Sequence, residues 1–179
     1  VGMGHPLDYQ PPMLMETVPA MVWGGQVRLI ARALGIELDD VREHVERRAL
    51  DTTVSTAAMG DFEAGTQGAV RFEVQGIVDG EARIVIEHVT RIHPSCAPDW
   101  PRPPDGDDGA HRVIIEGSPR IEVTVEATEN GNRSEGGNAT AVGRIVGALD
   151  WLVGAGPGLY DALDVPLRWI PGRTFGPAN

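Results

Sequence analysis

The chain has 179 residues, a length that suits one domain with its own core, and 41% of them are hydrophobic, which is typical of a globular protein. The formal net charge of −11 makes nucleic acid and anionic membranes poor partners, because binding to them depends on Lys and Arg. There is no apolar run long enough to span a membrane, no signal peptide pattern, and only one cysteine, which together favour a cytoplasmic protein.

The N-terminal part of the chain, up to about residue 45, has helical periodicity. Val27, Ile30, Ala31 and Leu34 follow the i, i+3, i+4, i+7 spacing of a single helical face. Gly35 follows directly and is a good C-cap residue. The pattern predicts an amphipathic helix that packs against the core with these four side chains and ends at the glycine.

A second short helix is predicted directly after this turn. Asp39 and Asp40 would lie in its first turn, where the helix dipole favours carboxylates, and Val41 and Val45 would face the core. Two helices joined by a glycine-containing turn resemble a helix-turn-helix, so a DNA-binding module is one alternative function. The recognition helix would begin at Glu37, however, and its acidic residues would face phosphate, which disfavours this alternative.

From about residue 49 the periodicity changes from helical to alternating. Val70, Phe72 and Val74 alternate with polar residues, and Asp79-Gly80 is a strong signal for a hairpin turn. Further strands are predicted near Thr53 to Ala58, over Ala82 to Ile92, and in a second hairpin of His111 to Glu116 and Arg120 to Ala127. Hairpins imply an antiparallel sheet with one face covered. The predicted fold class is therefore α+β, with an antiparallel or mixed β-sheet and helices packed on one face.

Two long loops separate these elements. The first, His93 to Gly109, is rich in Pro, Asp and Gly, and loops of that length are often functional. The second, Glu129 to Asn138, is rich in Gly and Asn and leads into a helix predicted over about Ala139 to Val153. No strand runs into a G-x-G-x-x-G turn at the start of a helix, so the chain is not expected to bind a dinucleotide by itself.

Four segments, taken in their order and spacing, carry a resemblance to a known family. They are VRLIARALGIELDDV at residues 27–41, EAGT at 63–66, APDWP at 97–101, and EGG at 135–137 followed by ATA at 139–141. They resemble the C-terminal region of dihydrodipicolinate reductase-like amino-acid and diamine dehydrogenases, in particular the 2,4-diaminopentanoate dehydrogenase group. The chain has no lysine and no His-His pair. The His-His-x-x-Lys residues of the dihydrodipicolinate reductases therefore cannot be transferred to it.

The resemblance implies a two-domain oxidoreductase in which residues 1–179 form a single α+β domain, the C-terminal half. An N-terminal Rossmann domain would bind NAD or NADP, and the α+β domain would supply the substrate pocket and build a homo-oligomer through its sheet. The reaction would be hydride transfer between the cofactor and a carbon bearing an amine, through an imine. The residues also leave open a non-catalytic domain that binds a small molecule or serves in assembly.

Two candidate site residues lie in the first long loop. His93 begins the loop and is the candidate catalytic acid–base group, because histidine titrates near neutrality. Trp100 either walls a substrate pocket or anchors the loop to the core. The single cysteine excludes the usual Cys-rich zinc sites, and no metal site is predicted.

Three more candidates lie where the second loop meets its helix. Asn138 and Thr140 stand at the predicted helix start, where free N–H groups and the helix dipole can hold a substrate carboxylate. Alternatively, Asn138 serves only as the N-cap. Glu135 nearby would suit an ammonium group instead. The sequence therefore predicts a substrate-binding loop for an amino acid or a diamine.

Overall fold

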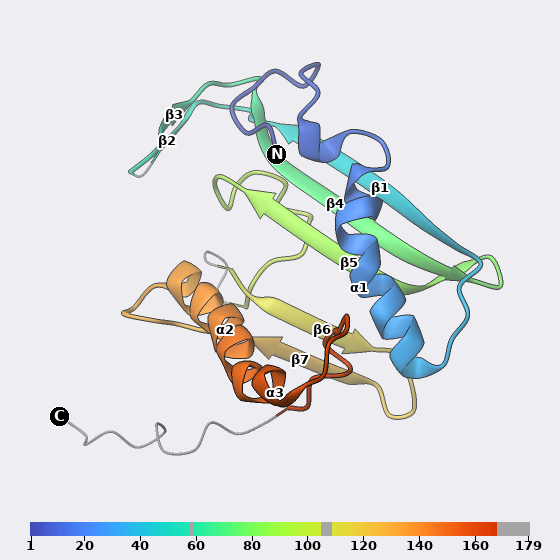
Figure 1. Cartoon of the computed structure of the whole chain (residues 1–179). Coiled ribbons are helices and arrows are strands. Elements are labelled where there is room, and N and C mark those ends of the chain that lie inside the picture. The colour runs from blue at the N-terminus through green and yellow to red at the C-terminus, as the bar shows by residue number, and fades with distance from the viewer. Residues whose placement is uncertain (58, 105–108, 168–179) are drawn as a thin grey trace. The chain divides into compact units, whose positions relative to one another are not determined.

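The computed structural model describes residues 1–57, 59–104 and 109–167. The chain divides into two compact units, Val1–Arg102 and Pro103–Asn179 (Figure 1). Helices occur in both units, and every strand pair in the described residues is antiparallel, so the α+β class is confirmed. The described part of the chain contains no helix with the length and hydropathy needed to cross a bilayer.

The first unit is centred on a three-stranded sheet of order β1-β4-β5. Its elements are η1 (Pro12–Leu14), α1 (Val18–Leu34), β1 (Asp40–Ala49), β4 (Gln67–Val78) and β5 (Glu81–Arg91). The predicted hairpin between β4 and β5 is confirmed: Asp79 and Gly80 both have positive φ, 52° and 78°, as a tight two-residue turn requires. Helix α1 packs on one face of this sheet, as Figure 1 shows, which positions the main core between them.

The core of this unit forms where α1 crosses β4. Val27 and Ala31 of the helix are buried against Phe72, whose ring lies 4.5 Å from that of Trp23. On the other side, the His88 ring stacks on Phe72 at 5.0 Å, and burial lowers the pKa of His88 below its usual range. This cluster closes the helix–sheet interface with aromatic surface, which contributes more burial per residue than aliphatic side chains do.

Two members of the predicted helical stripe are not part of this core. Val27 and Ala31 are buried as predicted, but Ile30 and Leu34 are exposed. The helix comes close to the sheet at Gly76, where an added Cβ would lie 2.7 Å from a Val27 methyl group. The buried line of α1 therefore runs through Pro19, Gly24, Val27 and Ala31, and Ile30 and Leu34 point outward.

Both ends of α1 are capped, the first by a distant side chain and the last by a local turn. At its start, the Thr17 side chain makes no capping hydrogen bond, and the Glu43 carboxylate of β1 accepts from the backbone N–H groups of Thr17 (2.6 Å) and Ala20 (2.8 Å). At its end, Gly35 adopts φ 67° and the N–H of Ile36 donates to the carbonyl of Ala31, which is a Schellman turn. The predicted C-cap at Gly35 is thus confirmed.

The second short helix predicted after Gly35 is wrong. Residues 40–49 form strand β1, which pairs with β4 in a register that runs from Asp40 opposite Ile77 to Arg48 opposite Ala69. Long-range pairing with a buried central strand outweighs the local helical signals of the two aspartates. With no second helix after the turn, the helix-turn-helix interpretation is wrong as well.

The strand predicted near Thr53 to Ala58 does not join the sheet. Strand β2 (Val54–Thr56) pairs with β3 (Gly60–Phe62) in a separate two-stranded hairpin, and residue 58 lies outside the described residues. Strands β2 and β3 have three residues each and pair with each other, and their hairpin stands apart from the main sheet (Figure 1).

The second unit contains the other predicted hairpin and helix. Strands β6 (His111–Ile115) and β7 (Ile121–Val125) pair as predicted. The helix predicted over Ala139 to Val153 starts earlier and is interrupted at Ala148, giving α2 (Arg133–Gly147) and α3 (Leu149–Gly154). Between residues 109 and 167 no described apolar side chain is buried.

Candidate functional site

The loop after β5 holds His93 on a rigid turn. The His93 carbonyl accepts from the Cys96 N–H at 3.0 Å, and the Ser95 hydroxyl and backbone N–H lie 2.7 and 3.2 Å from His93 Nδ1. Because the backbone N–H can only donate, Nδ1 is an acceptor and the proton of the neutral ring lies on Nε2. His93 is exposed, so this Nε2–H group is available to a ligand. The ring therefore presents a defined hydrogen-bond donor, and imidazole is the most common general acid–base group of proteins.

Trp100 lies in the same loop but inside the second core cluster of the unit. Its side chain is 4% exposed and packs with Leu50, Ala69 and Cys96. The Arg48 guanidinium covers the ring at 5.4 Å from the centroid. The indole therefore anchors the loop to the core, one of the two roles that the sequence allows. A direct contact between Trp100 and a substrate stays a prediction.

Two arginines and a buried thiol complete the loop. Arg91 and Arg102 donate to the carbonyls of Pro101 (2.9 Å) and Pro98 (3.0 Å), which fixes the backbone on both sides of Trp100. Burial raises the pKa of the Cys96 thiol, and the nearby Asp51 carboxylate raises it further. The thiol is therefore protonated at neutral pH and is not an activated nucleophile.

The second group of candidates lies on α2, and the structure corrects their position. The helix N-cap is Asn132, whose side chain accepts from the Glu135 N–H at 3.1 Å. Asn138 and Thr140 therefore lie inside the helix and not at its start, and the Thr140 hydroxyl donates to the Gly137 carbonyl. Gly136 is needed for close packing, because a Cβ there would lie 2.3 Å from the Ala127 carbonyl group.

Glu135 and Asn138 are both exposed and three residues apart in α2. This spacing places them on the same side of the helix, whereas Thr140 is turned away from that line. Glu135 and Asn138 together offer a carboxylate and an amide to one ligand. The structure thus places His93 and Trp100 on one loop of the first unit, and Glu135 and Asn138 on one helix of the second.

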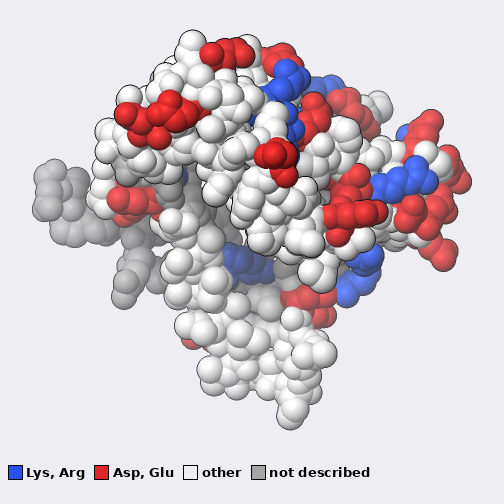
Figure 2. All heavy atoms as spheres, turned by 90° about the horizontal axis from the view of Figure 1, so that it is seen from above, with Lys and Arg blue, Asp and Glu red and all other residues white. Residues whose placement is uncertain are grey.

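A charged network missed by the sequence analysis covers the face of the first unit's sheet opposite α1. The Arg71 guanidinium pairs with Glu46 (2.9 Å), Glu87 (2.6 Å) and Glu73. Partial burial opposes ionisation, but these carboxylates hold the pKa of Arg71 above its usual range. One arginine does not neutralise three glutamates, so the network keeps a net negative charge. Figure 2 shows further acidic side chains spread over the face seen from above. The alternating charges of β4 were the signal available for it.

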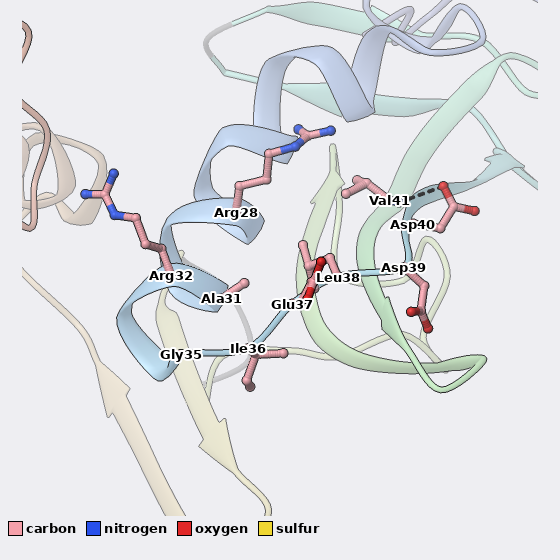
Figure 3. Close-up of a pocket in the computed structure, with 10 residues that line it drawn as sticks. All are labelled: Arg28, Ala31, Arg32, Gly35, Ile36, Glu37, Leu38, Asp39, Asp40 and Val41. Atoms are coloured by element: carbon pink, nitrogen blue, oxygen red, sulfur yellow. Dashed lines mark hydrogen bonds between the residues drawn. The ribbon is translucent and has the colours of Figure 1, made fainter.

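A shallow cavity of about 740 Å³ was also missed (Figure 3). It lies between the end of α1 and the segment that leads from Gly35 into β1. Its lining combines two arginines, three acidic residues and an apolar floor: Arg28, Ala31, Arg32, Gly35, Ile36, Glu37, Leu38, Asp39, Asp40 and Val41. The sequence signal was the acidic run after the C-cap, which we interpreted as the start of a helix.

Comparison with known proteins finds a matching family, a similar sequence and a similar solved structure. Residues 20–171 match the family described as 2,4-diaminopentanoate dehydrogenase C-terminal domain. The chain is 76% identical to a protein named amine dehydrogenase from Streptomyces virginiae. The alignment spans 174 residues, which are 97% of this chain and 48% of that protein. The solved structure of the amine dehydrogenase from Mycobacterium smegmatis aligns with a TM-score of 0.60, over 87% of this chain and 42% of that one. At 14% sequence identity, this match shows a similar fold. The chain thus spans about half the length of the curated relative it matches.

Proposed function

Because this chain belongs to the family of 2,4-diaminopentanoate dehydrogenase C-terminal domains, we propose that it is the substrate-binding and oligomerisation half of an NAD(P)-dependent oxidoreductase that acts on an amine, an amino acid or the related imine. The observation that carries this proposal is the 76% identity to an amine dehydrogenase along nearly the whole chain. The family that the four sequence segments indicated is confirmed by the match over residues 20–171.

The dinucleotide is assigned to a Rossmann half outside this chain. All strand pairs between described residues are antiparallel, and none of these strands leads into a glycine-rich turn at a helix start. The residues present therefore do not fit a dinucleotide pyrophosphate, which needs such a turn. When bound to the other half, the nicotinamide supplies or accepts the hydride.

The residues of this chain would act on the substrate. On the first unit, the Nε2–H of His93 would donate a hydrogen bond to the substrate, because the Ser95 N–H holds Nδ1 as an acceptor. Proton transfer by His93 at Nε2 would require Nδ1 to exchange this bond for a proton of its own. On the second unit, Glu135 would bind an ammonium group of a substrate, and Asn138 would hydrogen-bond a polar group beside it. Trp100 would keep the His93 loop in place through its buried ring.

The proposal that the other half of the protein binds the dinucleotide can be tested by measuring cofactor binding. We expect no micromolar binding of NAD(H) or NADP(H) to the 179-residue chain, and clear binding to the full-length protein, because the phosphate-binding turn is absent from this sequence. Isothermal titration calorimetry of both proteins measures this. Micromolar binding by the chain alone would contradict the two-domain proposal.

We also expect a homo-oligomer. The Val, Leu and Ile side chains of β6, β7, α2 and α3 are more than two-fifths exposed, among them Val113, Ile115, Val123, Ile145 and Val153. Exposed apolar surface on this scale is typical of a protein–protein contact. Light scattering should report a dimer or a tetramer for the full-length protein and for this chain. A monomer at high protein concentration would count against the assembly role.

Removing the polar groups of α2 tests the proposed substrate contact. We expect Asn138→Ala to lower kcat/KM of the full-length enzyme ten- to hundredfold, which corresponds to about 1.5–3 kcal/mol for a hydrogen bond lost from a charged substrate group. Thr140→Ala should have a smaller effect, because the Thr140 hydroxyl donates to the Gly137 carbonyl and is turned away from Asn138. Both residues are exposed inside a helix, where alanine is well tolerated, so the thermal unfolding midpoint should not fall. Unchanged activity would place the substrate contacts elsewhere.

A further inference from the structure

The cavity beside the end of α1 has an apolar floor. Ala31 is 3% exposed, and Leu38 and Val41 are partly buried against the main core cluster. None of the residues assigned to the proposed dehydrogenase site lines it. The floor can accept the methylene groups of a small ligand, while the polar groups around it determine which ligand ends are recognised.

Arg28 is the positive group available at this cavity. No hydrogen bond or ion pair joins its guanidinium to another residue in the described part of the chain. The side chain folds back over Gly24, where an added Cβ would lie 2.8 Å from the guanidinium Nη1 and 3.6 Å from a Val41 methyl group. In Figure 3 Arg28 extends from the helix towards the strands, whereas Arg32 points to the opposite side. An unpaired guanidinium fork of this kind suits a carboxylate.

Glu37 is the negative group available on the other wall. Asp40 is already engaged, because it accepts from Arg42 Nε (3.0 Å) and from the Val41 N–H (2.8 Å). Figure 3 draws Asp39 pointing away from α1. Glu37 is exposed and, among the residues that the structure describes, has no side-chain hydrogen bond or ion pair. Arg28 and Glu37 thus line one cavity with opposite charges and do not neutralise each other.

We propose that this cavity binds a small zwitterion, a molecule with a carboxylate at one end and an ammonium group at the other. Arg28 binds the carboxylate in a bidentate manner, Glu37 binds the ammonium group, and the ligand's methylene groups lie on Ala31 and Leu38. The class is that of amino acids whose two charged groups are separated by a short aliphatic chain. The site is independent of the proposed dehydrogenase reaction.

Titration with a homologous series of amino acids tests the proposal. The series runs from glycine through β-alanine and 4-aminobutyrate to 6-aminohexanoate, and the readout is the chemical shift of backbone amides 28–41 in the 15N-labelled chain. One chain length should bind best, because Arg28 and Glu37 come from the helix and the segment that directly follows it, and this backbone sets a preferred spacing of the two charges. Butyrate and n-butylamine, which each carry one of the two groups, should bind at least tenfold more weakly.

Two variants and two matched controls identify the residues. Arg28→Gln and Glu37→Gln should each weaken binding of the preferred amino acid at least tenfold. Arg83→Gln and Glu81→Gln remove a neighbouring exposed ion pair that does not line the cavity, and they should leave binding unchanged. Thermal unfolding verifies that each variant is folded. Absence of shifts with every member of the series, equal binding of butyrate or butylamine, or equal effects of the control variants would each overturn the proposal.

Discussion

Replacing Phe72 with alanine is expected to lower the free energy of unfolding by about 3–5 kcal/mol, the usual range for deleting a buried aromatic ring. Phe72 is 1% exposed and lies at the centre of β4. Its ring contacts Trp23 of α1 on one side and His88 of β5 on the other. Loss of the ring would therefore leave a cavity between the helix, the central strand and the edge strand.

Urea denaturation of the wild type and two variants measures this effect. Phe72→Leu keeps most of the apolar volume and should cost much less than Phe72→Ala. A control on the same sheet, Val85→Ala, removes a side chain that is 46% exposed and should change stability only slightly. A loss below about 1 kcal/mol for Phe72→Ala would show that the helix–sheet interface does not depend on this ring.

Replacing His93 with asparagine in the full-length enzyme is expected to lower kcat/KM about 10²- to 10⁴-fold, the range for loss of a general acid–base group. The expectation follows from the geometry of its ring. Ser95 holds Nδ1 as an acceptor, so Nε2 carries the proton, and the buried Trp100 keeps the loop in place. The pH profile of kcat/KM should also lose the limb that reports this imidazole.

Two further variants separate proton transfer from loop structure. Ser95→Ala removes the hydroxyl but keeps the backbone N–H that donates to Nδ1, so its effect should be less than about tenfold. His44→Asn replaces an exposed histidine of β1 and should leave both kcat/KM and its pH profile unchanged. If His93→Asn retains wild-type activity and the same pH profile, another group transfers the proton.

The parts of the fold that depend on local chemistry could be predicted from the sequence. The turn at Asp79-Gly80 needs positive φ at two adjacent residues, and few dipeptides allow it. The C-cap at Gly35 could be predicted for the same reason, because it also needs a positive φ, which glycine adopts readily. Strand β1 could not be predicted in this way, because its conformation depends on pairing with β4 at a sequence distance of about 20–40 residues. Asp39 and Asp40 carried a local helix signal that this pairing overrode.

The candidate site shows the same limit. The start of α2 is encoded in the sequence, because Asn132 and Glu135 have the spacing of a capping box, but Asn138 before the apolar stripe carries a competing N-cap signal. The cavity at Arg28 and Glu37 depends on where the chain leaves the helix and enters β1. The hydrophobic periodicity of a single segment does not show how the end of α1 and the start of β1 lie relative to each other. Residue types near a turn can be read from the sequence, whereas the cavity they line needs coordinates.

The cap that Glu43 places on α1 makes the helix and the sheet one cooperative unit. The first turn of α1 has no capping group of its own, and the two N–H groups that Glu43 accepts from lie 26 and 23 residues before it in the sequence. When β1 separates from β4, α1 loses its cap at the same time, and the exposed N–H groups favour fraying of the first helical turn. Amide hydrogen exchange at Thr17 and Ala20 therefore reports the opening of the sheet rather than of the helix alone.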